Sequence, residues 1–267
     1  YVSSTLANYS AFRQNTSAHQ RLVMGPWLHG DRNISHSGDV EFGPQAAFDG
    51  QVDQNWLSCR LAWFEQSLKP SPHAPKASVQ VFLMGGGSGQ RDPDGRLQHG
   101  GRWLQSAQWP LPGSRVQTLY LTAQGQLSGT APDATDACLS YLADPACPVP
   151  TLGGALTSGA PIFVGGAFDQ RERADFFGTR GDNRPLSERK DVLSFLTEPL
   201  IEDLIVAGDV QIELWIDSDA PDTDFTAKLI DLYPPSADYP DGFAMNITDG
   251  IRPVSYTHLR AHETEAD

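Results

Sequence analysis

The chain has 267 residues and a formal net charge of −14, from 33 acidic and 19 basic side chains. That length holds one large domain or two smaller ones. Lys and Arg do not cluster among aromatic residues, which argues against nucleic acid as a partner. No apolar run is long enough to cross a bilayer, which argues against a transmembrane protein. The sequence starts without Met or a signal-peptide pattern, so we expect the N-terminal part of a longer protein to be missing.

Three cysteines are too few for a disulfide framework or a thiolate metal site. Free thiols in a cytosolic protein are the favoured interpretation of Cys59, Cys138 and Cys147. A disulfide between Cys138 and Cys147 is the alternative for an exported protein. The compartment therefore stays open, with the cytoplasm slightly favoured over export.

The first seventy residues predict mixed helix and strand. A short helical stripe over residues 6–13 precedes a buried strand over 21–24, which ends at Gly25-Pro26. Residues 53–69 predict an amphipathic helix with Asp53 as its N-cap. Its apolar face consists of Leu57, Leu61, Phe64 and Leu68.

A proline-rich stretch, "PSPHAP" at 70–75, marks the predicted domain boundary, with a linker over 70–77. Beyond it, short alternating segments separated by Gly, Pro and Asp turns indicate an antiparallel β-sandwich over 78–253. Double-sheet folds of this kind commonly have jelly-roll topology, here of the galactose-binding-like type. The predicted strands are 79–84, 116–121, 209–217 and 225–233. Residues 254–267 break this pattern and resemble a translated sequencing adapter, so we expect a non-native tail.

His29 is the candidate catalytic residue. It lies in "RLVMGPWLHGD" (21–31), where a buried strand ends at a glycine-proline turn and leads to a glycine-bounded loop. A lone loop histidine is most often structural or exposed to solvent. In an α/β-hydrolase, however, the catalytic base follows the last strand and comes last in the order Ser, Asp or Glu, His.

"LVMGPWLHG" resembles the G-P-W-x-H-G segment of the X-prolyl dipeptidyl-peptidase and cocaine-esterase (CocE/NonD) serine hydrolases. The resemblance extends over roughly residues 1–252, and its ordered motifs together are specific. Further matching segments are "HSGDVEFGPQAAFD" (36–49), "VFLMGG" (81–86), "RWLQSAQWP" (102–110), "YLADPACPVPTLGG" (141–154), "RKDVLSFLTEPL" (189–200) and "DSDAPDTDFTAKLIDLYP" (217–234).

The resemblance implies a mixed fold. Residues 1–69 would be the C-terminal end of an α/β-hydrolase catalytic domain, and 78–253 the family's C-terminal β-sandwich. It also implies a serine-hydrolase triad in which His29 is the general base and a serine attacks an acyl carbonyl. The expected substrates are small acyl esters or peptides, with dipeptidyl-peptidase activity among the options, and no cofactor or metal is expected.

The other two triad members are missing from this sequence. No G-x-S-x-G elbow occurs, and Ser88 in "GGGSGQ" is interpreted as a turn residue. No Asp or Glu precedes His29, and Asp31 follows it too closely to orient its ring. In the family the aspartate precedes the histidine by a few tens of residues, so we expect it upstream of Tyr1. We therefore expect this chain alone to be inactive.

A non-catalytic β-sandwich that binds carbohydrate or protein is the alternative function, because a fold does not define a function. The spacing of the acidic residues and histidines argues against metal sites. The Asp217–Asp224 run does not fit an EF-hand loop, and His29 with His36 fits no standard zinc spacing.

Overall fold

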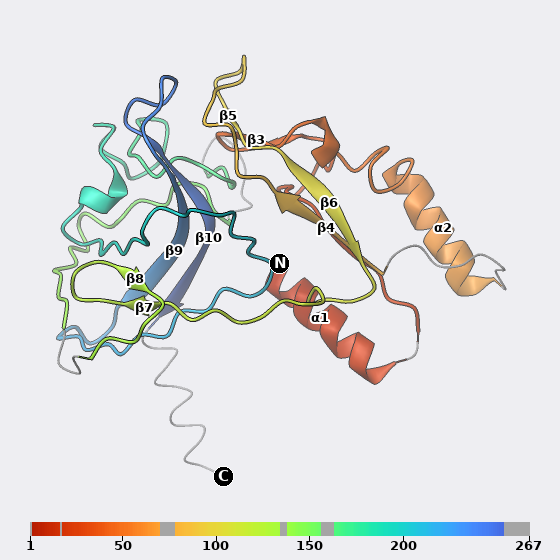
Figure 1. The fold of residues 1–267 in the computed structure, drawn as a ribbon, viewed down its shortest axis with the longest axis horizontal. Helices are drawn as coiled ribbons and strands as arrows, with labels where there is room; N and C mark the ends of the chain where they lie inside the picture. The colour runs from red at the N-terminus through yellow and green to blue at the C-terminus, as the bar shows by residue number, and fades with distance from the viewer. Residues whose placement is uncertain (1, 17, 70–77, 134–137, 156–162, 254–267) are drawn as a thin grey trace, which may run out of the picture.

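The computed structural model describes residues 2–16, 18–69, 78–133, 138–155 and 163–253 (Figure 1). Its helical elements are α1 (Val2–Asn15), η1 (Pro44–Ala46), α2 (Trp56–Leu68) and η2 (Leu186–Glu188). Its strands are β1 (Leu22–Met24), β2 (His36–Ser37), β3 (Val40–Glu41), β4 (Val79–Met84), β5 (Leu97–Gln98), β6 (Gly101–Ser106), β7 (Tyr120–Leu121), β8 (Leu127–Ser128), β9 (Asp224–Tyr233) and β10 (Phe243–Pro253). Within these ranges, no helix has the length and apolarity needed to cross a membrane.

The loop that carries His29 follows β1, an edge strand of a three-stranded sheet with the order β1-β4-β6. In this sheet β1 is parallel and β6 antiparallel to β4. Successive residues of a strand point to opposite faces. Leu22 packs with Tyr9 of α1 on one face, whereas Val23 packs against Phe48 and Cys59 on the other. The sheet therefore lies between α1 and the segment that includes α2, and its strands come from both sides of residues 70–77.

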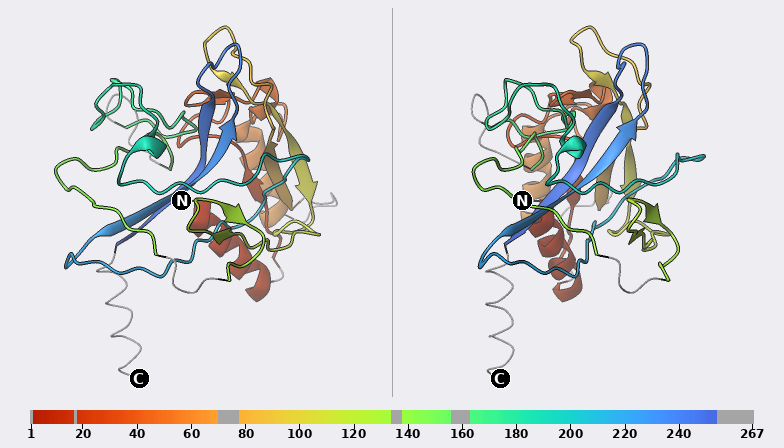
Figure 2. Two further views of the ribbon diagram at one scale, coloured as in Figure 1. Left: turned by 60° about the vertical axis from the view of Figure 1, so that its left-hand side comes forward. Right: turned by 90° about the vertical axis from the view of Figure 1, so that its left-hand side faces the viewer.

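The largest core cluster joins the small sheet β2-β3-β5 to β4 and to the long hairpin of β9 and β10. Its fully buried members include Val40, Leu97 and Met245. Figure 2 shows the β9–β10 ribbon beside the β4–β6 strands. Within the first sheet, Gly101 of β6 permits the close approach of β6 to β4, because an added Cβ would lie 2.3 Å from the Phe82 ring and side chains rarely adopt its φ of +148°.

Several predicted elements are confirmed: both helices, the strand over 21–24, and those over 79–84 and 225–233. The N-cap of α2 is a correction. Asn55, not Asp53, forms the cap, with its side chain accepting from the Ser58 amide at 2.8 Å and the Ser58 hydroxyl accepting from the Asn55 amide at 3.1 Å. Asp53 instead lies 3.8 Å from the Arg21 guanidinium.

Two predicted strands are wrong in whole or in part. Only Tyr120–Leu121 of 116–121 is a strand, and 209–217 is not one. In 209–217 the four alternating aliphatic side chains are 45–52 % exposed and Trp215 is 96 % exposed. Alternation matches the period of a strand, but a strand also needs a neighbouring strand to pair its backbone N–H and C=O groups.

The strand-rich character of residues 78–253 is confirmed in outline. Within the described ranges, β7-β8 and β9-β10 form two-stranded sheets, and β4, β5 and β6 pair in two three-stranded sheets that also include β1 or β2 and β3 of the first part. Jelly-roll topology and the assignment of residues 1–69 to the end of an α/β-hydrolase domain stay predictions. The linker at 70–77 and the tail at 254–267 lie outside the described residues, so the domain boundaries also stay predictions.

Candidate functional site

His29 lies on the surface, in the loop that leaves the carboxyl end of β1. The chain turns at Gly25-Pro26 directly after the strand. An added Cβ at Gly25 would lie 2.5 Å from the Trp27 ring, so the backbone passes directly beneath this indole. A glycine is therefore required where the strand turns into the histidine loop.

Two tryptophans attach this loop to neighbouring elements. Trp27 and Trp103 of β6 have ring centroids 5.6 Å apart. Their indole N–H groups donate to consecutive backbone carbonyls of η1, Trp27 to Ala46 and Trp103 to Gln45, each at 2.8 Å. Each buried face of an indole thus packs while its polar edge is satisfied. The loop that presents His29 is consequently attached to a strand that follows residues 70–77.

The far side of the loop is fixed by a second set of contacts. The Arg32 guanidinium lies 4.2 Å from the Trp56 ring centroid at the start of α2. The Arg32 carbonyl accepts from the Phe48 amide at 2.9 Å. Asp31 accepts from the Asn33 amide at 2.8 Å, which is a local turn contact. The exposed histidine is therefore carried on a loop that is anchored at both ends.

The remaining sequence candidates lie elsewhere. Ser88 lies between β4 and β5, where its hydroxyl accepts from the Gln90 amide at 3.3 Å, again a turn contact. Cys138 and Cys147 are free thiols in this structure. In the ranges that the structure describes, no three His, Cys, Asp or Glu side chains gather in a group suited to a metal ion.

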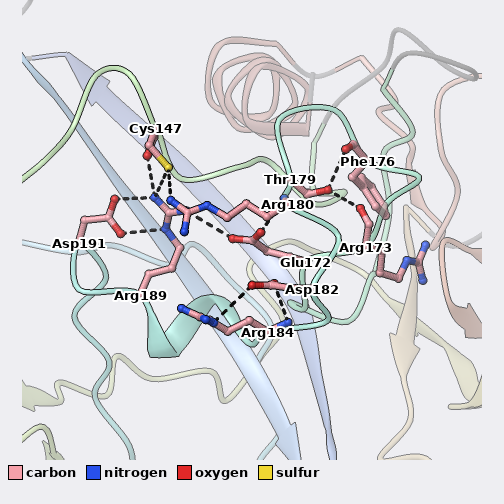
Figure 3. A network of polar contacts seen from close by, with 10 residues as sticks. All are labelled: Cys147, Glu172, Arg173, Phe176, Thr179, Arg180, Asp182, Arg184, Arg189 and Asp191. Carbon is pink, nitrogen blue, oxygen red and sulfur yellow. Dashed lines mark hydrogen bonds and ion pairs between the residues drawn. The ribbon is translucent and has the colours of Figure 1, made fainter.

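A network of charged side chains, which sequence reasoning missed, lies around Arg189 (Figure 3). The Arg189 guanidinium binds both oxygens of Asp191 at 2.8 and 2.7 Å. It also lies 3.4 Å from the buried Glu172 carboxylate and donates to the Cys147 carbonyl at 2.8 Å. Glu172 in turn accepts from the Arg180 amide at 2.8 Å.

This network neutralises charge and attaches the 144–154 turn to the segment around η2. The hydrogen bonds from Arg189 lower the pKa of Asp191, and those to Asp191 raise the pKa of Arg189. A buried carboxylate such as Glu172 must be paired, so its role here is to hold two segments together. The sequence signal that could have indicated these ion pairs is an aspartate two residues after an arginine, which occurs at 189–191 and 173–175.

Two buried basic groups lie outside both sites. Burial lowers the pKa of His99, whose ring packs near Phe42 and Tyr233 and whose two ring nitrogens have no hydrogen-bond partner. Burial likewise lowers the pKa of Lys228, which pairs in register with Asp249 of β10. His99 therefore belongs to the core that joins the small sheet to β9.

Comparison with known families identifies the class of the chain. Residues 73–266 match the X-Pro dipeptidyl-peptidase C-terminal non-catalytic domain. This match covers most of the sequence, and the chain belongs to the X-Pro dipeptidyl-peptidase and cocaine-esterase (CocE/NonD) family.

A curated relative extends the similarity to the first part of the chain. The cocaine esterase of Rhodococcus sp. (strain MB1 Bresler) is 32 % identical over 277 residues, which cover 99 % of this chain and 41 % of the relative. The chain thus spans less than half the length of that relative. No solved structure matches the chain significantly.

Proposed function

We propose that this chain is part of a serine hydrolase and carries its general base, His29, together with its C-terminal domain. The observation that carries the proposal is the exposed His29 on a doubly anchored loop at the carboxyl end of a parallel strand. Ligands of open α/β sheets bind at the carboxyl ends of the strands. The parent would hydrolyse acyl esters or peptides.

In this mechanism the serine and the aspartate belong to the part of the parent outside this chain. His29 takes the proton of the serine as the hydroxyl attacks the acyl carbonyl, and then returns it to the leaving alcohol or amine. Water hydrolyses the acyl-enzyme in the same way, with His29 again as base. The two indoles attach the loop that carries His29 to η1 and β6, which fixes the backbone from which the imidazole extends.

The boundaries of the family match support the assignment of His29 to the catalytic part and of the later residues to a non-catalytic domain. The non-catalytic model starts at residue 73, after α2 ends at Leu68, so the His29 loop precedes it. The similarity to the cocaine esterase covers 99 % of the chain and therefore includes the histidine loop.

The test uses the parent protein, expressed after its coding sequence upstream of Tyr1 has been recovered from the source DNA. His29→Ala should lower kcat/KM for p-nitrophenyl acyl esters and X-Pro amides by roughly 10³-fold or more. His36→Ala is the matched control, because His36 pairs in the short sheet with Glu41, and its effect should stay within a few fold. Equal activities of the two variants would refute His29 as the base. The present chain alone should show no hydrolysis above background.

A binding module for carbohydrate or protein is the second candidate, because the model that matches residues 73–266 describes a non-catalytic domain. A glycan array and thermal-shift measurements with simple sugars test it directly. Specific sugar binding by this chain, together with an inactive parent, would favour the binding module over the hydrolase.

A further inference from the structure

The loop that carries His29 also carries an arginine that forms no ion pair with an acid of the described chain. Arg32 is partly buried, and its guanidinium stacks on the Trp56 ring. Asp31, its neighbour in the sequence, accepts from the Asn33 amide instead. The other partly buried arginines of the described ranges each pair with an aspartate: Arg21, Arg96, Arg171, Arg173 and Arg189. Arg32 therefore differs from them in keeping its charge unneutralised.

The guanidinium of Arg32 is held in one place and points back along the loop toward His29. Its Nη1 atom lies 3.5 Å from the carbonyl oxygen of Gly30, the residue after His29. Trp56, on which it stacks, packs edge-on against Phe48 with ring centroids 5.3 Å apart. The Phe48 amide in turn donates to the Arg32 carbonyl. The backbone and the charged group of Arg32 are thus attached to the same aromatic pair, which limits where the charge can lie.

The polar edge of this guanidinium is available to a ligand. Stacking occupies the face of the group and leaves its in-plane N–H donors free, and this fork of donors matches a carboxylate. Beside it the loop surface is open, since a Cβ added at Gly30 would have no described atom within 4 Å. The side chains of Leu28 and Ile34, 39 and 42 % exposed, supply apolar surface on the same loop.

The leaving group of the substrate is the part that comes closest to this cation. In the mechanism above, His29 returns a proton to the leaving alcohol or amine, so the leaving atom lies within hydrogen-bond reach of the imidazole. The three peptide units from His29 to Arg32 span at most about 11 Å. A carboxylate a few bonds beyond the leaving atom is therefore within reach of the guanidinium.

We propose that Arg32 binds a carboxylate of the leaving group, so that the parent prefers acyl esters and amides of hydroxy acids and amino acids. This inference rests on the proposed function and names its substrate class. The bond from the acyl carbon to the leaving oxygen or nitrogen breaks, that atom takes the proton from His29, and the acyl group passes to the serine and then to water. The carboxylate stays ionised throughout, and Arg32 forms and breaks no covalent bond.

Because Arg32 contacts a group that does not react, it stabilises the bound substrate and the transition state alike. Its loss should therefore raise KM and leave kcat nearly unchanged. A purely structural role in the loop would instead displace His29 and lower kcat for every substrate. The two roles thus differ in which kinetic constant changes and in whether the leaving group matters.

The test compares two esters in the full-length parent that differ in one group. Meta-butanoyloxybenzoate and meta-butanoyloxybenzamide share the acyl group, but only the first has a charged leaving group. Arg32→Gln should lower kcat/KM roughly tenfold for the benzoate and less than about threefold for the benzamide. Arg32→Lys keeps the charge without the planar fork and should fall between the two. Arg60→Gln, at an exposed α2 residue, is the matched control and should leave the ratio unchanged.

Three results would overturn the proposal. The first is an unchanged ratio of the two kcat/KM values in Arg32→Gln, and the second is an equal loss on both esters, which would indicate a structural role. The third is the same change in Arg60→Gln, which would assign the preference to the overall charge. The phenyl monoester of succinic acid carries its carboxylate on the acyl side. A selective loss on this ester in Arg32→Gln would place the carboxylate on the wrong side of the scissile bond for the proposal.

A calorimetric titration of the parent with meta-hydroxybenzoate needs no catalysis, so it separates this inference from the proposed function. Weaker binding in Arg32→Gln, together with undiminished activity in His29→Ala, would retain the carboxylate site and reject His29 as the base. Loss of activity in His29→Ala, with unchanged binding and an unchanged ester ratio in Arg32→Gln, would retain the proposed function and reject the role of Arg32.

Discussion

Replacing Trp103 tests whether the second part of the chain supports the histidine loop. Trp103→Ala removes a ring whose centroid lies 5.6 Å from Trp27 and 5.4 Å from Phe82. Truncation of a core tryptophan costs about 3–5 kcal/mol. Since Trp103 is only partly buried, we take about 3 kcal/mol for the ring. The lost hydrogen bond to the Gln45 carbonyl adds about 1 kcal/mol.

Two further variants separate the contributions. Trp103→Phe keeps an aromatic ring at this position but loses the indole N–H, so we expect a cost of about 1 kcal/mol from the hydrogen bond, plus a smaller packing loss. Trp215→Ala is the matched control, because Trp215 is 96 % exposed and its truncation should change stability by no more than about 0.5 kcal/mol.

The assay is urea unfolding of this chain followed by far-UV circular dichroism, which does not depend on tryptophan emission. The NMR signal of the His29 imidazole provides a local readout, and it should shift in Trp103→Ala but not in Trp215→Ala. If Trp103→Ala and Trp215→Ala had equal free energies of unfolding, the conclusion that Trp103 supports the loop would be refuted. An unshifted His29 signal in a destabilised Trp103→Ala would place the effect in the core alone.

Two further predictions concern the core and α2. Because burial lowers the pKa of His99 in the folded state, the unfolded chain binds the extra proton first, so stability should be present above pH of about 6.5 and decline as the pH falls below it. His99→Leu should flatten the dependence of the urea midpoint on pH between about 5 and 7, and an unchanged slope would contradict the assignment. Asn55→Ala should cost about 1 kcal/mol through the lost cap of α2, whereas Gln54→Ala, at an exposed neighbour, should stay near zero.

Local sequence patterns predicted those elements whose structure depends on nearby residues. The apolar spacing over 57–68 predicts α2, and the strand periods over 79–84 and 225–233 predict β4 and β9. Apolar spacing does not define where α2 starts, since Asp53 and Asn55 are both good caps. Ser58 decides between them, because its hydroxyl completes a reciprocal pair of hydrogen bonds with Asn55.

The candidate base was also accessible from the sequence, because "GPWLHG" combines a strand end, a turn and an exposed histidine within a few residues. The support of that loop was not. Trp27 and Trp103 are 76 positions apart in the sequence, and no periodicity relates them. The Glu172–Arg189 contact likewise depends on how distant backbone segments approach one another.

Residues 209–217 show where local sequence patterns stop predicting the structure and tertiary pairing decides it. Their alternation satisfies the side-chain rule for a strand, yet their aliphatic residues are exposed and no described segment pairs with them as a strand. Side-chain period is a property of the local sequence, whereas backbone pairing needs a second segment at about 4.8 Å. The local sequence therefore determined the elements that depend on nearby residues. Only the tertiary structure decided how β1 pairs with β4, where the His29 loop lies and which face of α2 points outward.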